Sequence, residues 1–309
     1  MEFYECDLHT HTTNSDGRDI YEEIILNAKR RGVKILAITD HDITPLETIE
    51  AEGEKISPKD YAKRNGIYLI PGIEYSCDTD VEDVHILGLG CNFSDPGFSE
   101  EQLKIEKSKI DTFKALVEAI NEKGFKITWE EVLNQNSAHT DANVQKKHIF
   151  ELMAKHGMTK TWKEAKILTQ VEHPYVDFKR EKILPQSAIN LIHKSGGIAI
   201  LAHPYLIDEV TATGIKRRDY IESIISFGID GIEAAYPYSK TSYKGSLTDK
   251  HIEDEVKKAY ENRLKIISGG SDYHNDSKIG LKVVREIGEK GVTLKYFMSN
   301  KYLRQLIEE

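Results

Sequence analysis

The sequence predicts an α/β protein made of β/α units with parallel strands and interrupted by a helical insertion. Short apolar runs alternate with helical patterns over residues 1–98 and again over 170–309, as in β/α units. Between these two parts, residues 99–169 show the apolar spacing of helices. The 309 residues are enough for a barrel-sized domain and an insertion, so we expect 1–98 and 170–309 to form one domain around a helical domain at 99–169.

Two runs in the first part predict buried strands. "VKILAITDHD" at 33–42 and "GIYLIPGIEYS" at 66–76 are apolar through their middles and end in polar residues. The stretch between them, from Pro45 to Asn65, is polar, and we expect it to be helical or irregular.

The insertion carries helix-start and helix-stop signals. Thr128 with Glu131, and Thr161 with Glu164, each fit a capping box, in which two residues satisfy each other's backbone N–H groups. Gly124 is a natural end for the long helix before it. Within that helix the apolar residues at helical spacing are Leu103, Ile110, Phe113, Val117 and Ile120.

The alternation of strands and helices resumes after the insertion. "GGIAILAHP" at 196–204, "GIDGIEAAYP" at 228–237 and "LKIISGGSDYH" at 264–274 predict strands. Helical patterns at Pro185–Ser195 and Lys250–Asn262 lie between them.

Composition excludes several classes of protein. The net charge of −9 makes the chain a poor binder of long duplex nucleic acid. No apolar run is long enough to cross a membrane and no secretory signal is visible, so we expect a cytoplasmic protein. The odd count of cysteines argues against a disulfide framework, and none forms a C-x-x-C pair for thiolate zinc: Cys6, Cys77 and Cys91.

Candidate metal ligands gather where strands are expected to end. The first run closes with "DLHTHTTNSD", and His9 and His11 point to one face of a strand because strand side chains alternate. Functional groups collect at the carboxyl ends of parallel strands, so these residues would meet in one pocket. Taken singly, each has a structural interpretation as a helix cap, a backbone-bonded histidine or a surface carboxylate. The full set is His9, His11, Asp16, His41, Glu74, His203, Asp272 and His274, with His85 inside "DVHILGLG".

These motifs together resemble one known family. The series H-x-H, "TDHD", "GIE", a following histidine, "LAHP" and "GGSDYH" is similar to the PHP (polymerase and histidinol phosphatase) superfamily, especially its stand-alone bacterial phosphoesterases. The resemblance runs nearly end to end and includes the insertion. It implies a distorted (β/α)7 barrel with a trinuclear metal site.

The resemblance also implies which residues bind each metal. One metal would be held by His9, His11, Glu74 and Asp272. Glu74 would bridge to a second metal, held by His85 and His203. The third would be held by Asp16, His41 and His274.

Charge counting is compatible with phosphate chemistry. Three carboxylates and six neutral histidines around three divalent cations leave a net charge of about +3, which suits a phosphate dianion and a hydroxide. Nitrogen and oxygen ligands fit Mn, Fe, Zn or Co, and Mg is less favoured among so many imidazoles.

We therefore expect phosphoester hydrolysis by a metal-activated water, with no separate general acid assigned. Asp40 and Asp42 flank His41 and would orient ligands; the alternative is that they are ordinary polar residues at a strand end.

A basic segment of the insertion is a candidate substrate contact. "VQKKHIFELMAKHG" resembles the family segment in which an Arg-Pro-His motif contacts substrate phosphate, with Lys147 and His148 at the matching positions. Lysine lacks the bidentate fork of arginine. The alternative is a solvated helix face with an incidental basic run.

The resemblance suggests a small phosphorylated substrate, such as a nucleoside 3′,5′-bisphosphate or the 5′ end of a very short RNA, and no obligate protein partner. Three alternatives stay open. They are a phosphodiesterase for cyclic phosphates, an amidohydrolase, and a non-enzymatic metal-binding module associated with a polymerase. Glu74 disfavours the amidohydrolase, since that family often has a carboxylated lysine on the corresponding strand.

Overall fold

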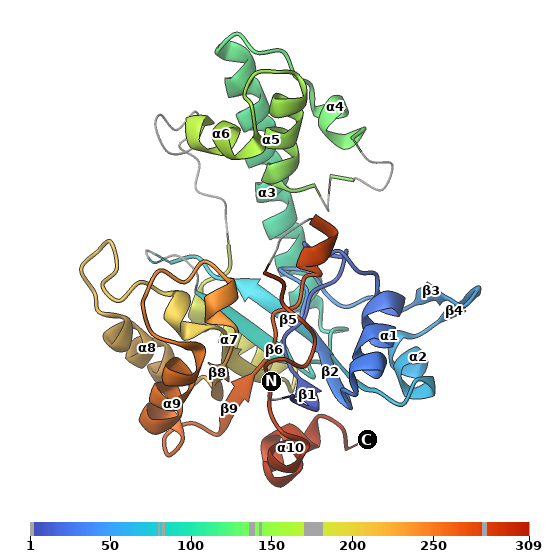
Figure 1. The fold of residues 1–309 in the computed structure, drawn as a ribbon, viewed down its shortest axis with the longest axis vertical. Helices are drawn as coiled ribbons and strands as arrows, with labels where there is room; N and C mark the ends of the chain where they lie inside the picture. Colours follow the sequence, from blue (N-terminus) through green and yellow to red (C-terminus); the bar gives the residue numbers. More distant parts are fainter. Residues whose placement is uncertain are drawn as a thin grey trace. The chain divides into compact units, whose positions relative to one another are not determined.

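The computed structural model describes residues 3–79, 81, 84–135, 140–141, 144–169, 182–279 and 283–308. The chain divides into two compact units, one formed by Met1–Ser99 with Ile183–Glu309 and the other by Glu100–Lys182. The first unit contains the sheets and the second is helical (Figure 1). The predicted return to the first domain at residue 170 lies outside the described residues.

Seven strands of the first unit form one sheet that curves into a nearly closed barrel (Figure 1). Its strand order is β1-β2-β5-β6-β7-β8-β9. The two end strands approach each other where the Leu8 amide donates to the Gly269 carbonyl over 3.3 Å. The predicted distorted (β/α)7 barrel with a helical insertion is therefore confirmed. The strands are β1 (Cys6–Asp7), β2 (Ile35–Ile38), β5 (Tyr68–Ser76), β6 (His85–Leu89), β7 (Ile198–Leu201), β8 (Gly231–Ala235) and β9 (Ile266–Gly269).

One strand breaks the expected parallel pattern. β6 pairs antiparallel with both β5 and β7, whereas the other neighbouring pairs of this sheet are parallel. The prediction of parallel strands was wrong here because the residues between β5 and β6, 77–84, are too few for a crossover helix. His85, the first residue of β6, pairs with Ser76, the last residue of β5. It thus lies at the rim where the parallel strands end.

The barrel closes through a glycine. A Cβ on Gly270, just after β9, would lie 2.3 Å from the Cβ of His9, so this close approach of two backbones needs glycine. Beside it, the Asp272 amide donates to the His9 carbonyl over 2.8 Å and the His11 amide donates to the Tyr273 carbonyl over 2.9 Å. These bonds place the segments "DLHTH" and "GGSDYH" side by side.

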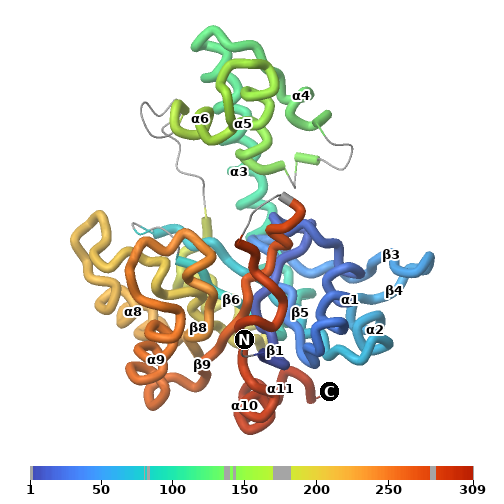
Figure 2. Tube along the Cα trace, viewed as in Figure 1, coloured from blue at the N-terminus to red at the C-terminus, as the bar shows by residue number. Residues whose placement is uncertain are grey.

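Helices cover the outer face of the barrel, and two short ones close the end at which the parallel strands begin (Figures 1 and 2). There Phe297 and Leu303 join an apolar cluster with Ile35 and Ile266, the first residues of β2 and β9. One end of the barrel is therefore filled with apolar side chains. The helices of this unit are α1 (Tyr21–Arg31), α2 (Pro58–Arg64), α7 (Pro185–Lys194), α8 (Arg217–Ser226), α9 (Asp249–Tyr260), α10 (Leu294–Ser299) and α11 (Lys301–Gln305), with 3-10 turns η2 (Pro204–Leu206), η3 (Tyr238–Lys240) and η4 (Asp276–Ile279).

The stretch from Pro45 to Asn65 contains a hairpin that the sequence analysis did not predict. β3 (Ile49–Ala51) pairs antiparallel with β4 (Glu54–Ile56), ahead of α2. The turn residues Glu52 and Gly53 have φ of 51° and 81°, as a tight two-residue hairpin turn requires. The expectation of helix or irregular structure was wrong for β3 and β4, because strands of three residues carry too little alternation to detect.

The second unit has a core of its own. Residues at the predicted helical spacing, among them Phe113, Val117 and Ile120, are buried in one apolar cluster. The predicted capping box forms between Thr128 and Glu131. At Thr161 only half of the predicted box forms, because the Thr161 side chain accepts from the Glu164 amide while the Glu164 carboxylate accepts from the amide of Lys160 instead. The helices are α3 (Pro96–Glu122), α4 (Trp129–Leu133), α5 (Lys146–Lys155) and α6 (Trp162–Ile167).

Among the described residues, no helix is both long and apolar enough to cross a membrane.

We expect Phe297→Ala to destabilise the protein by roughly 3–5 kcal/mol, because it leaves a cavity among fully buried side chains. Urea denaturation measures this change in the free energy of unfolding. Met298→Ala on the same helix removes a side chain that is 42% exposed and should cost less than about 1 kcal/mol. Equal costs for both variants would contradict the packing of α10 into the barrel.

Candidate metal centre

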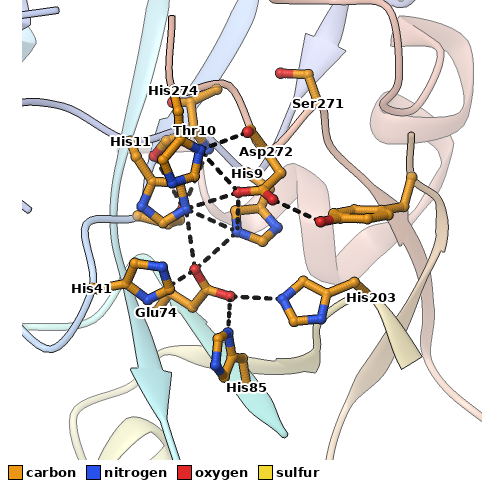
Figure 3. Close-up of polar contacts among 12 residues, drawn as sticks. His9, Thr10, His11, His41, Glu74, His85, His203, Ser271, Asp272 and His274 are labelled. Atoms are coloured by element: carbon orange, nitrogen blue, oxygen red, sulfur yellow. Dashed lines mark hydrogen bonds and ion pairs between the residues drawn. The ribbon is translucent and has the colours of Figure 1, made fainter. Parts of the chain in front are cut away.

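Glu74, on β5, lies at the centre of a cluster of histidines and is fully buried (Figure 3). Its Oε1 atom is 2.9 Å from Nδ1 of His85 and 3.1 Å from Nε2 of His203. Its Oε2 atom is 3.1 Å from Nε2 of both His9 and His11. Oε2 is also 3.3 Å from Nδ1 of His41. The two oxygens of one carboxylate thus face different imidazoles, a geometry that suits a bridging ligand.

A second carboxylate meets the same two N-terminal histidines. Asp272, just after β9, places Oδ1 3.1 Å from Nε2 of His11 and 3.5 Å from Nε2 of His9. The chain leaves β9 in a sharp turn here, since Asp272 has a φ of 50°. His203, after β7, has a φ of 27°. Such strained conformations in non-glycine residues cluster at functional sites.

A third carboxylate lies at the edge of the cluster. Oδ1 of Asp16 is 3.0 Å from Nε2 of His274, 3.8 Å from Nδ1 of His11 and 4.0 Å from Nε2 of His41. Asp16 is more exposed than Glu74, so this part of the cluster is open to solvent.

All nine candidate ligands from the sequence therefore converge on one rim of the barrel. The structure brings these ligands together in three sets, in each of which the ligand atoms lie within 4.8 Å of one another. These sets differ slightly from the three groups of metal ligands that the family resemblance implies. His11 joins the set around Asp16, and His41 joins Glu74 and His85, while His203 contacts Glu74 from the side. The sets are His9, His11, Glu74 and Asp272; His11, Asp16, His41 and His274; and His41, Glu74 and His85.

The donor atoms fit divalent cations. The Nε2 atoms of His9 and His11 are 3.1 Å apart, so the two rings cannot both hold a proton between them. In the described part of the chain, the buried Nδ1 atoms of His11, His41 and His203 have no hydrogen-bond partner. A buried polar atom without a hydrogen-bond partner lowers the free energy of unfolding. Imidazole nitrogens and carboxylate oxygens arranged in this way are suitable ligands for transition metals.

Electrostatics keep two of the carboxylates ionised. Burial alone would raise the pKa of Glu74, but the neighbouring imidazoles, His41 foremost, hold that pKa well below its usual value. Burial would likewise raise the pKa of Asp272, yet His274 and Arg285 hold it well below its usual value. Both groups are therefore anionic oxygen donors at neutral pH.

Two residues that the sequence analysis missed fix Asp272. The Tyr236 hydroxyl and Nη1 of Arg285 each donate to Oδ2 of Asp272 over 2.7 Å. That leaves Oδ1 facing the histidines. Tyr236 stands at the end of a predicted strand and could have been found by that position. Arg285 lies in an irregular segment that carries no sequence signal.

A third missed residue, Glu233 on β8, is fully buried beside the histidines. Its Oε1 is 3.3 Å from Nδ1 of His9, and its Oε2 accepts from the His203 amide over 2.8 Å. A proton on Nδ1 of His9 leaves Nε2 as the donor to a metal. The signal was available, because Glu233 is the one acid within the apolar strand "GIEAA".

Asp40 and Asp42 stabilise the loops around the centre. Asp40 accepts from the Thr12 amide and the Ser15 hydroxyl, each over 2.7 Å, and so holds the loop that carries Asp16. Asp42 accepts from the Ser76 amide over 2.9 Å.

Lys147 and His148 lie on α5 in the second unit, and the nine candidate metal ligands lie in the first. Within the second unit, Nζ of Lys147 is 3.2 Å from Oε1 of Glu151 and 5.2 Å from the centre of the Trp162 ring. Nδ1 of His148 accepts from the Gln145 amide over 3.1 Å.

Known proteins share this sequence pattern and fold. A family model described as "PHP domain" matches residues 7–192. A phosphoribosyl 1,2-cyclic phosphate 1,2-diphosphodiesterase of Eggerthella lenta is 28% identical over 277 residues, covering 87% of this chain and 93% of the relative. The 5′-3′ exoribonuclease Rnm of Escherichia coli is 31% identical over 295 residues, covering 93% and 92%. A solved structure from Bifidobacterium adolescentis, described as a metal-dependent phosphoesterase, has the same fold, with a TM-score of 0.72, 20% identity and coverage of 97% and 96%.

We expect Tyr236→Phe to weaken Mn²⁺ binding about 10- to 100-fold, because it removes one of the two donors that orient Asp272. Titration calorimetry of the metal-free protein measures this affinity. Tyr238→Phe is the matched control, since that buried hydroxyl accepts from the Tyr205 amide. If the two variants lose the same affinity, the orienting role of Tyr236 is wrong.

Glu233→Gln keeps the size of the side chain but replaces one acceptor oxygen with a donor. We expect Mn²⁺ affinity to fall by about 10-fold or more, because His9 is no longer held in one tautomer. Glu253→Gln, at another buried carboxylate that pairs with Lys257, should leave Mn²⁺ affinity unchanged. Unaltered affinity in Glu233→Gln would rule out this orienting role.

Proposed function

This chain belongs to the PHP family of metal-dependent phosphoester hydrolases, and we propose that it removes phosphate from small nucleotides or from the 5′ end of short oligonucleotides. The family resemblance inferred from the motifs is thereby confirmed. The observation that carries the proposal is the position of Glu74, whose two oxygens contact imidazoles from strands on both sides of β5.

We propose that three divalent cations bind at this rim, with Mn, Fe or Zn favoured and Mg or Co as further options. The nine converging residues would be their ligands: His9, His11, Asp16, His41, Glu74, His85, His203, Asp272 and His274. Cations bound there would lower the pKa of a coordinated water to supply the nucleophile, and would neutralise the phosphoryl oxygens.

The residues of the chain have separate tasks in this proposal. Glu74 links the ligand sets, because its two oxygens face different histidines. Tyr236 and Arg285 keep Oδ1 of Asp272 turned toward the cluster. The half-exposed Asp16 marks the side from which a substrate phosphate would enter.

The substrate class follows from two considerations. The net charge of −9 disfavours long duplexes and leaves small phosphorylated molecules. The E. coli relative is named an exoribonuclease, which supports a short oligonucleotide. The E. lenta relative is named for a cyclic phosphate, which keeps a phosphodiesterase for small cyclic phosphates as the second candidate. A phosphate-release screen with Mn²⁺ over bisphosphates, cyclic phosphates and 5′-phosphorylated short RNAs separates them.

Further assignments belong to the same proposal. Asp40 and Asp42 would hold the ligand-bearing loops in place, in keeping with their hydrogen bonds to Thr12 and Ser76. Lys147 and His148 would contact substrate phosphate, as the matching family segment does. We propose a cytoplasmic location, which the lack of a disulfide at the three buried cysteines favours, and no obligate protein partner.

We expect His9→Ala and Asp272→Ala each to reduce phosphate release to the background rate, because each removes a ligand from the most buried set. Malachite-green assays with Mn²⁺ measure turnover, and circular dichroism checks that the barrel remains folded. His251→Ala removes an exposed histidine on α9 and should keep full activity. Full activity in both ligand variants would refute the metal assignment.

A further inference from the structure

Helices α8 and α9 lie on the outer side of the barrel (Figure 1). Residues of both helices line a large groove. Its volume of about 1030 Å³ is that of a site for a sizeable ligand. Its lining includes Tyr205, Val210, Tyr243 and Leu247. We call this feature the α8–α9 groove.

Cations without ion-pair partners line the groove. Lys216, Arg218 and Lys258 are exposed, and none has an ion pair within 4.0 Å or a side-chain hydrogen bond to another described residue. By contrast, Lys244 pairs with Asp208 at the same mouth. Four acids also line the groove, but its six lysines and arginines outnumber them, and this local excess of positive charge in a chain with a net charge of −9 favours an anionic ligand.

Flat and apolar side chains accompany these cations. Tyr205 and Tyr243 are half-buried in the wall of the groove. Val210 and Leu247 are 56% and 38% exposed and add apolar surface to the groove. The Arg217 guanidinium stacks on the Tyr205 ring at 4.3 Å. Basic side chains beside aromatic surfaces are the combination that binds single-stranded nucleic acid, by phosphate neutralisation and base stacking.

A short row of aromatic rings connects the groove with the metal ligands. The Tyr236 ring lies 5.2 Å from that of His203 and 4.7 Å from that of Tyr238. Tyr238 in turn contacts both groove tyrosines, with centroids 6.1 Å from Tyr205 and 5.5 Å from Tyr243. Tyr236 and Tyr238 are buried, so they form a wall with the metal ligands on one side and the groove on the other.

We propose that the α8–α9 groove binds the nucleotides of a single-stranded oligonucleotide that follow the one at the metal centre. The inference rests on the proposed function and narrows its substrate class to a chain of several nucleotides. Lys216, Arg218 and Lys258 neutralise successive phosphates, and the groove tyrosines stack on bases. A duplex is excluded from this role because its base faces are already stacked on one another.

The test compares Lys216→Gln/Arg218→Gln with the wild-type, Mn²⁺-loaded enzyme on two substrates. For a 5′-phosphorylated tetraribonucleotide, we expect kcat/KM to fall about 10-fold in the variant, with a salt dependence shallower by about 1.4 in log–log slope, since two phosphate contacts are lost. For p-nitrophenyl phosphate, which is too small to reach the groove, kcat/KM stays unchanged. Lys59→Gln/Lys63→Gln removes two exposed lysines from α2 and should change neither substrate.

Several outcomes would overturn the groove assignment. Unchanged turnover of the tetraribonucleotide, or an equal loss on both substrates, contradicts it. A loss of self-association by the groove variant in sedimentation, with oligonucleotide turnover intact, would show an interface between copies of this chain. Failure of the wild-type protein to hydrolyse any phosphoester is a different result, because it refutes the proposed function itself.

Discussion

The contact of the buried Glu74 carboxylate with surrounding imidazoles is the interaction on which the rest of the structure depends. A buried anion is stable only when opposite charges or hydrogen-bond donors surround it. Here the histidines come from the ends of β1, β2, β6 and β7, so these strands must reach the rim in register for the carboxylate to be satisfied. The same requirement explains the antiparallel β6, which brings His85 to this rim by its first residue.

One end of the barrel stabilises the fold, and the opposite end carries the candidate metal ligands. At the end where parallel strands begin, Phe297 and Leu303 complete a packed apolar cluster. At the opposite rim, carboxylates and imidazoles converge and the backbone is strained at His203 and Asp272. Polar crowding and strain of this kind persist only where the surrounding structure imposes them. The close approach of Gly270 to His9 and the hydrogen bonds beside it supply that constraint.

Tyr236 and its neighbour Tyr238 connect the metal ligands at the rim with the α8–α9 groove. Tyr236 orients Asp272 through its hydroxyl, and its ring belongs to the wall that ends at Tyr205. The metal centre and the α8–α9 groove therefore share a structural element. An oligonucleotide held in the groove would lie against the wall of Tyr236 and Tyr238, and Tyr236 also positions Asp272. The wall therefore links the length of the bound substrate to the geometry of the metal centre.

The sequence by itself determined the fold class and the positions of the candidate ligands. Strand ends and caps are local, so the periodicity around His41 or the cap at Thr128 could be predicted from neighbouring residues. Only the tertiary structure decided the direction of β6, the hairpin turn at Gly53 and the contacts of Arg285. These features depend on contacts between distant segments of the chain, or on strands too short to show an alternating sequence pattern. Glu233 could be noticed as an acid in an apolar strand, but only folding placed it beside His9. Likewise, only folding brought the groove cations of α8 and α9 together. Local signals specify an element, whereas long-range packing specifies which side chains meet.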